Sequence, residues 1–580
     1  MDKWTVARAL REIASYIELS EPNPFKARAF ESAARRIESL DRSVDDLVAT
    51  GGLHSTPGIG RSIGPIVADL VTKGHSAYLD ELRSRYPPGI FELLRVPALG
   101  LKKIGVLYSE LGIASLDELE AAAQAGRVAG LAGFGAKTQK KILDGIATAR
   151  RRSSQFLLSF GLEVGESLRG RLAQIDAIED AIVSGSVRRR LEIVDSVDIV
   201  VATGDSVRAI AEVEKRGLLD RLEQDGWTML RGFGRDEIPV SLHLTAPADC
   251  GAALVVTTGS ADFVEAFAST IAKNGFELRH RELFHNGRHI RSENESALFE
   301  RVAVPFVDPE LRESGDVLRR KKRVRLVEPA DLKGTFHVHT TFSDGRNSVA
   351  EMLSAARDRG FDYVGISDHS PNAFYANGVT VDDLTGQHAE IDAQRALVAP
   401  MRVFRGTEAD ILDDGTIDYG HATLPRFDFV VASIHSRFAM DREAMTARML
   451  RALDDPFVTI LGHLTGRLLL GRTGYAIDFD RVFDRAAERG VMIEINGNPH
   501  RLELDWRLAG RAIDRGVLLC INPDAHSIAE LSHVISGVWL ARKAGLSAKH
   551  IFNTRPVDEV ADYLEKRRQK AMERVLSAEC

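Results

Sequence analysis

The last part of the sequence places histidines and carboxylates at the ends of short apolar runs. His337 and His339 alternate with Val338, so on a strand both imidazoles would leave the same face and could bind one cation. Imidazole and carboxylate groups together suit Zn²⁺, Mn²⁺ or Fe²⁺, and a carboxylate can bridge two cations and lower their mutual repulsion. The candidate ligands are His337, His339, Asp344, His369, Glu408, His435, His463, Asp524 and His526. This set predicts hydrolysis at a centre of several metal ions.

The candidates recur at the same place in successive strand–helix units. His369 follows the run VGIS, His435 follows VVASI, and His463 follows TILG, in each case at the carboxyl end of an expected strand. Repeated units of this kind predict a barrel of parallel strands surrounded by helices. Barrel enzymes build their active sites at this edge, so we expect the ligands to converge there.

The order of the motifs indicates a family. His-x-His, Ser-Asp-Gly, Ser-Asp-His, Gly-Thr-Glu, Ser-Ile-His-Ser, Gly-His and Pro-Asp-Ala-His follow one another along the chain. In this order the region resembles the polymerase and histidinol phosphatase (PHP) family of metal phosphoesterases. The resemblance implies a distorted seven-unit βα barrel in which the candidate ligands hold three divalent metal ions, Glu408 bridges them, and metal-bound water is the nucleophile.

The first 149 residues read as short helices broken by glycine turns. Three of these turns look like helix-hairpin-helix motifs, in which glycine permits a positive φ and the next helix offers amide N–H groups to a DNA phosphate. Ala98 stands in the second turn where glycine is usual. The predicted DNA contacts are Gly58 with Gly60, Gly100 with Lys102 and Lys103, and Gly133 with Gly135.

Strand-like runs alternate with helical ones from about Phe160 to Val324. Gly185, Ser186 and Arg189 precede Asp198, and Thr258-Gly259-Ser260 follows, a pattern that resembles the palm of family X DNA polymerases. The whole chain is thus similar to bacterial family X polymerases fused to a PHP domain. The resemblance implies that Ser186 and Arg189 bind phosphate.

The resemblance divides the chain into α and α/β domains. We expect a helical DNA-binding domain at residues 1–85, a fingers-like domain at 86–155, a nucleotidyltransferase-like palm at 156–262, a thumb-like domain at 263–317, a basic linker at 318–333 and the PHP barrel at 334–580.

The palm departs from its family at two of three catalytic acids. Ser196 and Ser241 stand where the family has carboxylates, which leaves Asp198. A two-metal phosphoryl transfer with most of its carboxylates missing is slowed by many orders of magnitude. The sequence therefore predicts a weak or absent polymerase and argues against Mg²⁺ at the palm. The alternative is that Asp195, with another acid such as Asp236, completes the site.

The composition describes a globular protein with 44% hydrophobic and 27% charged residues and a net charge of −7, in which no apolar run reaches the length of a membrane span. Its three cysteines form no C-x-x-C pair, which argues against a thiolate metal site. Without a secretory signal at the amino terminus, we expect a cytoplasmic, nucleoid-associated monomer.

These features together predict a DNA-repair nuclease that holds gapped or nicked DNA and cleaves phosphodiesters at a 3′ end. An active gap-filling polymerase, a small-molecule phosphatase of the histidinol phosphatase type and a non-catalytic DNA scaffold are the alternatives. The basic run from Arg319 to Arg325 either tracks the DNA backbone or is a solvated linker.

Overall fold

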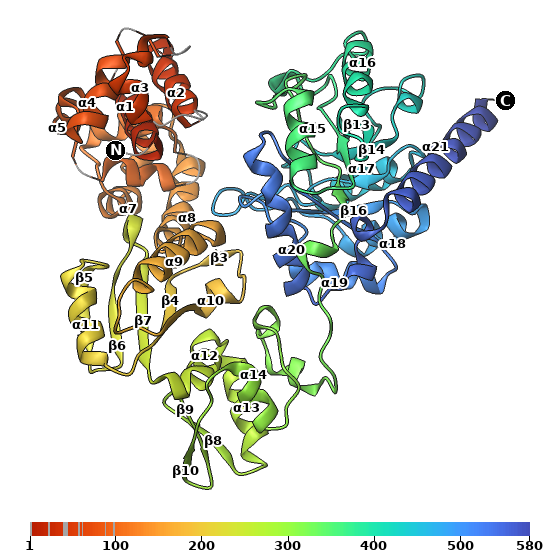
Figure 1. Ribbon diagram of the computed structural model, residues 1–580. Helices are drawn as coiled ribbons and strands as arrows, with labels where there is room; N and C mark the ends of the chain where they lie inside the picture. The colour runs from red at the N-terminus through yellow and green to blue at the C-terminus, as the bar shows by residue number, and fades with distance from the viewer. Residues whose placement is uncertain are drawn as a thin grey trace. The chain divides into compact units, whose positions relative to one another are not determined.

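The computed structural model of the protein describes residues 3–20, 24–38, 44–55, 59–60, 62–87, 89–96 and 99–579. The chain forms two compact units, residues 1–154 and residues 155–580 (Figure 1). Within the described ranges, no helix is both long enough and apolar enough to cross a membrane.

The first unit consists of helices, as its glycine-broken runs predict. One apolar core surrounds Leu10 and Phe30, and a second surrounds Ile104. A capping box opens one helix: Ser115 accepts a hydrogen bond from the Glu118 N–H, and the Glu118 side chain accepts one in return. The α-helices are α1 (Lys3–Ser20), α2 (Pro24–Glu38), α3 (Val44–Ala49), α4 (Gly64–Lys73), α5 (Ala77–Ser84), α6 (Leu101–Leu111), α7 (Leu116–Gln124) and α8 (Ala136–Ser153).

The second unit begins with an α/β domain around a five-stranded sheet in the order β2-β4-β7-β6-β5. Only β4 and β7 run parallel in this sheet. Alternate residues of β7 are buried, so one face of the sheet forms the core. The elements are β1 (Phe156–Leu157), α9 (Leu158–Leu172), β2 (Asp180–Ser184), α10 (Gly185–Arg188), β3 (Ile193–Val194), β4 (Val197–Ala202), α11 (Ser206–Lys215), β5 (Asp220–Asp225), β6 (Met229–Phe233), β7 (Pro239–Thr245) and α12 (Cys250–Thr258).

A small domain of helices and a three-stranded antiparallel sheet follows. Its core contains Phe263, Phe267 and Phe299. Arg312 is fully buried there and pairs with Glu295, with its Nη1 at 2.5 Å from Oε1. The elements are α13 (Ala261–Ala272), β8 (Phe276–Arg279), β9 (Glu282–His285), β10 (Arg288–Ile290) and α14 (Glu295–Arg301).

The rest of the second unit is the predicted barrel. Its seven strands are parallel in the order β11 to β17, and Val338 pairs with Ala525 so that the first and last strands meet. The strands are β11 (Gly334–Thr335), β12 (Tyr363–Ile366), β13 (Arg402–Asp410), β14 (Phe429–Ser433), β15 (Ile460–Leu461), β16 (Met492–Asn496) and β17 (Leu519–Asn522). The helices are α15 (Val349–Asp358), α16 (Leu384–Arg395), α17 (Arg442–Asp454), α18 (Phe479–Arg489), α19 (Trp506–Asp514), α20 (Val534–Lys543) and α21 (Val557–Glu579).

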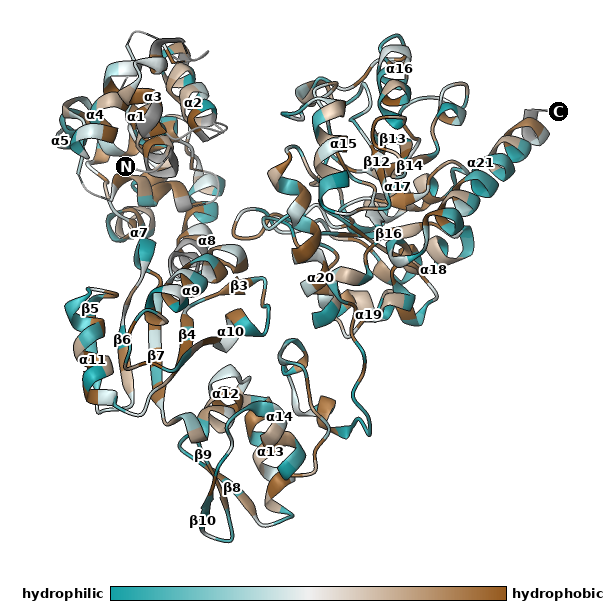
Figure 2. Ribbon diagram, in the orientation of Figure 1, coloured by the Kyte–Doolittle hydropathy of each residue, from teal (hydrophilic) through white to brown (hydrophobic). Residues whose placement is uncertain are grey.

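The barrel strands are buried on both sides, which is typical of parallel sheets covered by helices. Every residue of β14 is buried. Figure 2 shows hydrophobic residues within the barrel strands near the labels β13 and β14. Glycines on two neighbouring strands make room for the ring of Phe429. A Cβ on Gly406 would lie 2.2 Å from that ring, and one on Gly365 would lie 2.5 Å from it. Side chains at these positions would therefore push the strands apart.

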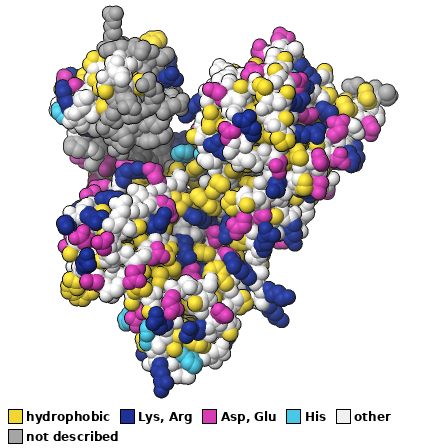
Figure 3. Space-filling view, in the orientation of Figure 1, with side chains coloured by type: hydrophobic (Ala, Val, Ile, Leu, Met, Phe, Trp, Pro, Cys, Tyr) yellow, Lys and Arg dark blue, Asp and Glu magenta, His cyan; other side chains and the backbone are white. Residues whose placement is uncertain are grey.

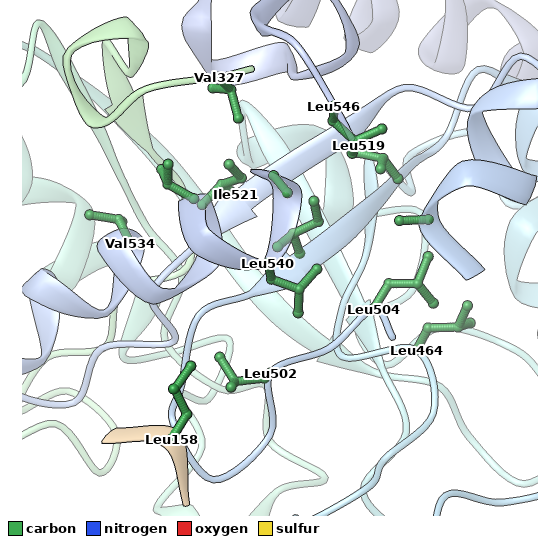
Figure 4. Close-up of a cluster of buried hydrophobic side chains, with 14 of the residues drawn as sticks. Leu158, Val327, Leu464, Leu502, Leu504, Leu519, Ile521, Val534, Leu540 and Leu546 are labelled. Atoms are coloured by element: carbon green, nitrogen blue, oxygen red, sulfur yellow. The ribbon is translucent and has the colours of Figure 1, made fainter. Parts of the chain in front are cut away.

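The palm-like domain packs against the barrel within the second unit. Leu158 lies beside Leu502 in one buried apolar cluster (Figure 4). The buried carboxylate of Glu192 accepts hydrogen bonds from Trp506 Nε1 at 3.3 Å and from Arg507 Nη1 at 3.2 Å. Elsewhere the visible surface of this unit carries both signs of charge interspersed (Figure 3).

Candidate metal centre

The barrel brings the nine predicted ligands together at the carboxyl ends of its strands. The cluster is closed to solvent at its base, where His337 and His339 have no exposed surface. Asp344 approaches from the loop that follows β11. In chain order, His337 and His339 follow β11, His369 follows β12, Glu408 lies in β13, His435 follows β14, His463 follows β15, and Asp524 and His526 follow β17.

Glu408 lies at the centre of the cluster and is 1% exposed. Its Oε2 is 3.0 Å from His369 Nδ1 and 3.3 Å from His337 Nε2. Its Oε1 is 2.9 Å from His463 Nε2 and 3.3 Å from His435 Nε2. Each carboxylate oxygen thus faces a different set of imidazoles, which is the arrangement of a ligand that bridges two cations.

A second carboxylate extends the cluster toward the solvent. Asp344 Oδ1 lies 3.3 Å from His526 Nε2 and 3.6 Å from His369 Nε2. At the other side, Asp524 Oδ1 is 3.6 Å from His339 Nε2. The donor atoms form three overlapping groups, each within 4.8 Å: His339, Asp344, His369 and His526; His337, His339 and Asp524; and His369, Glu408 and His435.

Unpaired ring nitrogens in the base of the cluster fit metal ligation. Neither ring nitrogen of His339 has a hydrogen-bond partner, and Nε2 of His337 also lacks one. Buried polar atoms without partners are costly and rare, and a cation would satisfy them. Burial lowers the pKa of His339 to about 3, helped by the nearby imidazoles of His526 and His369. His339 is therefore neutral at pH 7, in the form that binds metal ions.

Residues behind the ligands orient them, and sequence reasoning missed these. Glu494 Oε1 is 2.6 Å from His337 Nδ1, and Asp410 Oδ1 is 2.6 Å from His435 Nδ1. Such carboxylates set which ring nitrogen faces the metal. Glu494 stands in a fully buried strand, Met492–Asn496. A carboxylate inside an apolar run was the available signal, because an unpaired buried charge would be too costly.

A cation and an aromatic residue stand beside the ligands. Arg501 Nε lies 3.5 Å from Asp524 Oδ2, and its side chain is 18% exposed. The ring of Tyr375 lies 6.3 Å from that of His369. Burial raises the pKa of Tyr375, and the carboxylates of Asp410 and Glu408 add to the shift, so Tyr375 stays a phenol. Neither residue belonged to the predicted site.

Of the three positions expected to carry the catalytic acids of the palm, Asp198 on β4 is the one with a carboxylate. Its Oδ1 lies 2.9 Å from His243 Nε2, and its Oδ2 accepts a hydrogen bond from Ser196 Oγ at 3.3 Å. Ser241 is the register partner of Asp198 on β7. A Cβ on Gly185 would lie 2.4 Å from Asp198 Oδ2, so this side chain is packed against the start of α10. Hydroxyl and imidazole groups thus surround the acid.

The alternative acids lie in turns between strands. Asp195 is exposed in the turn between β3 and β4. Asp236 lies in the turn between β6 and β7, with its Oδ2 at 3.6 Å from Arg235 Nε. In the part of the chain that the structure describes, every group of three or more residues able to hold a metal ion lies in the barrel.

Arg189, a predicted phosphate ligand, is held within the protein. Its Nε lies 3.1 Å from Glu313 Oε1, and its Nη1 donates to the Thr258 carbonyl. Glu313 Oε1 is also 2.5 Å from Lys543 Nζ. Ser186 lies in the short helix α10 just before it. Any phosphate at this place would have to displace these bonds.

The predicted hairpin turns are only partly within the described residues, and Gly58 lies outside them. The other four predicted glycines, Gly60, Gly100, Gly133 and Gly135, are described. Only Gly133 has a positive φ, of 82°, so the expected conformational reason for glycine applies at Gly133 alone. A Cβ on any of them would meet nothing within 4 Å. Lys103 Nζ lies 5.8 Å from the ring centre of Phe134. Lys102 is exposed in the first turn of α6.

The basic linker forms ion pairs of its own. Arg323 Nη2 lies 2.7 Å from Asp308 Oδ1, and Arg325 Nη2 lies 3.0 Å from Asp331 Oδ1.

The fold and the site define a metal phosphoesterase barrel joined to polymerase-like domains, and comparison with known proteins agrees. Family models match as a helix-hairpin-helix domain at residues 1–76, a DNA polymerase beta thumb at residues 253–313 and a PHP domain at residues 335–498. The DNA polymerase/3′-5′ exonuclease PolX of Bacillus subtilis (strain 168) is 33% identical over 572 residues, which cover 98% of this chain and 100% of that protein. The chain belongs to the family X DNA polymerases that carry a C-terminal PHP domain.

A second type of relative matches a smaller part of the chain. A probable phosphatase of Caldanaerobacter subterraneus subsp. tengcongensis is 27% identical over 251 residues, 40% of this chain and 91% of that protein. The comparisons confirm the predicted family and fold class. They also confirm an enzyme that has DNA-binding domains and a divalent-metal phosphoesterase domain.

Proposed function

We propose that this protein is a DNA-repair enzyme that removes nucleotides from 3′ ends in its barrel, and that its polymerase activity is weak or absent. The observation that carries the proposal is the position of Glu408 between two sets of imidazoles, surrounded by the remaining ligands. Divalent ions bound there would lower the pKa of a bound water and clamp the oxygens of a phosphodiester. The PolX relative, whose name includes a 3′-5′ exonuclease, supports this activity for the chain.

The chain's own residues prepare this reaction. Glu494 and Asp410 hold His337 and His435 so that their Nε2 atoms face Glu408. Arg501, beside Asp524 at the edge of the cluster, is placed to attract the anionic backbone. The surrounding barrel wall excludes water from the base of the cluster, which strengthens each electrostatic contact.

The side chains around Asp198 in the palm support the proposed loss of polymerase activity. Asp198 faces His243, Ser196 and Ser241, and the neutral hydroxyls cannot supply the charge that paired Mg²⁺ ions require. We therefore assign the palm a role in holding DNA or the barrel, with Asp198 as a remnant of the polymerase site.

The finer features of the proposal concern metals, substrate and assembly. Three ions, Mn²⁺ or Zn²⁺ with Fe²⁺ as a further candidate, match the three overlapping donor groups. Gapped or nicked DNA suits three hairpins that grip the backbone without reading sequence. We further propose that the protein acts as a monomer and, because its partner is DNA, at the nucleoid.

The test is Mn²⁺-dependent shortening of a 5′-labelled primer together with metal analysis of the purified chain. We expect the wild type to shorten the primer from its 3′ end, and His339→Ala or Glu408→Ala to lower the rate by about 100-fold or more. His421→Ala is the matched control, because His421 lies in the same domain and pairs with Asp455 on the surface.

Equal digestion by wild type and both ligand variants would overturn the nuclease assignment. A small-molecule phosphatase is the second candidate, favoured by the probable phosphatase that matches 40% of this chain. Hydrolysis of histidinol phosphate with no action on DNA would select it.

A further inference from the structure

Two consecutive aromatic side chains project from the barrel beside the metal centre. Phe374 is 84% exposed and Tyr375 is 57% exposed, in the short turn Phe374–Ala376 that follows β12. Among the described residues, no other two neighbours in sequence are both aromatic and exposed to this extent. Exposed rings of this size forgo the free energy of burial, so their position calls for a partner.

The pair is anchored to the ligand cluster. The Tyr375 ring lies 6.3 Å from that of His369 and 6.1 Å from that of His435. Phe374 lies 6.0 Å from Tyr375 at an interplanar angle of 78°. In this edge-to-face arrangement a flat group can stack on the Phe374 ring while it remains next to the ligands.

A hollow of about 450 Å³ adjoins these rings. This volume lies within the roughly 300–1,000 Å³ of small-molecule sites. His435 and Asp410 line the hollow on the side of the metal centre. Asn372 lines it as well and is held in place by its Nδ2, which donates to Asp410 Oδ2 at 2.7 Å. Arg437 borders the hollow with a side chain that is 69% exposed, and its Nε donates to Asp413 Oδ2 at 2.8 Å.

We propose that this hollow is the subsite for the nucleobase of the nucleotide being removed, with the base stacked on the face of Phe374 and its edge toward Tyr375. This inference rests on the proposed nuclease function and names the part of the substrate that the site recognises. Stacking on an aromatic ring accepts any base, because every base has a π-face. Asn372 and Arg437 supply polar groups at the rim for the edge of the base or the sugar. The site thus distinguishes a nucleotide from a bare sugar phosphate.

The first test compares two 5′-labelled single strands that differ only at the 3′ terminus, one ending in thymidine and the other in a tetrahydrofuran residue that lacks a base. We expect the wild type with Mn²⁺ to remove thymidine about tenfold faster. Phe374→Ala should reduce this ratio to within about twofold, since its ring carries the stacking face and contacts no ligand ring. Leu397→Ser, which alters an exposed apolar residue elsewhere on the barrel, should keep the wild-type ratio.

The second test measures binding in the absence of metal. A strand that ends in 2-aminopurine loses fluorescence when its terminal base stacks on an aromatic ring. With EDTA present, we expect quenching by the wild type and by Leu397→Ser, and its loss in Phe374→Ala. Tyr375→Phe, which keeps the ring, should quench as the wild type does.

The outcomes separate this inference from the function on which it rests. A wild-type protein that hydrolyses neither DNA nor bis(p-nitrophenyl) phosphate contradicts the proposed function. If the wild type cleaves DNA but removes both termini at equal rates, or if Phe374→Ala leaves both the ratio and the quenching unchanged, the nucleobase subsite alone is refuted.

Discussion

The Nδ1 atom of His337 lies 2.6 Å from Oε1 of Glu494 inside the barrel. The other oxygen of Glu494 accepts a hydrogen bond from the backbone N–H of His463 at 2.7 Å. Burial acts to raise the pKa of the Glu494 carboxyl, whereas the nearby His337 acts to lower it. The lowering is the larger effect on balance, so the carboxyl is ionised at neutral pH. The ionised carboxylate therefore holds the His337 ring in the orientation in which its Nε2 faces Glu408.

Replacing Glu494 by Gln should weaken metal binding by about 10- to 100-fold, as is typical when the partner of a ligating histidine is lost. The Gln side chain has a similar size, but it has an NH₂ group in place of one carboxylate oxygen. That group would face either His337 Nδ1 or the His463 N–H, and it cannot accept a hydrogen bond from either one. Competition titration with a chelating dye measures the affinity. Glu488→Gln, at an exposed surface position, is the control. Wild-type affinity in Glu494→Gln would show that the contact does not orient the ligand.

Primer extension with Mg²⁺ or Mn²⁺ should yield no templated product, because one carboxylate cannot hold the ions of a two-metal transfer. A family X polymerase with a complete acid triad serves as the positive control. Asp198→Ala should leave 3′-end degradation at the wild-type rate, since Asp198 lies in the palm. Robust incorporation that disappears in Asp198→Ala would show that the palm is an active polymerase.

Acid should destabilise the barrel through His388. Burial lowers the pKa of His388 to about 4, and Arg405 and Arg426 add to the shift. Since the folded pKa lies below the unfolded value of about 6.5, the unfolded state binds the proton more tightly. The stability linked to His388 is complete above about pH 6.5 and is lost as the pH falls toward about 4.

Urea unfolding at about pH 7 and pH 4.5 measures this loss. We expect the free energy of unfolding to fall about 1–2 kcal/mol more in the wild type than in His388→Gln, after allowance for partial solvent contact. His421→Gln, at an exposed histidine, should behave as the wild type. An identical pH dependence in His388→Gln would refute the role of this residue.

Lys102→Ala should weaken DNA binding and lower the slope of log K against log salt by about 1, because one phosphate contact is lost. Lys102 is exposed in the first turn of α6, directly after the turn at Gly100. Binding to labelled gapped DNA at several salt concentrations gives the slope. Lys566→Ala removes a lysine on the barrel surface and should keep the wild-type slope. Equal slopes for all three proteins would exclude this hairpin from the DNA contact.

The sequence by itself determined the fold class, the family and the residues that converge in the barrel. Ligands that follow strands such as β12, β14 and β15 must meet, because parallel strands end at the same edge of a barrel. The absence of acids at Ser196 and Ser241 was equally visible, since chemical type is a property of the residue alone.

Only the tertiary structure decided how these groups pair. Glu494, separated from His337 by 157 positions, reaches it because β16 and β11 belong to one closed sheet. Arg189 matched a phosphate-binding pattern, yet its guanidinium is held by Glu313 from another domain of the same unit. Phe374 and Tyr375 belong to none of the sequence motifs, and only the structure shows that they are exposed beside His369 and His435. Spacing along a chain sets which face a side chain occupies, but distant contacts depend on how the elements pack.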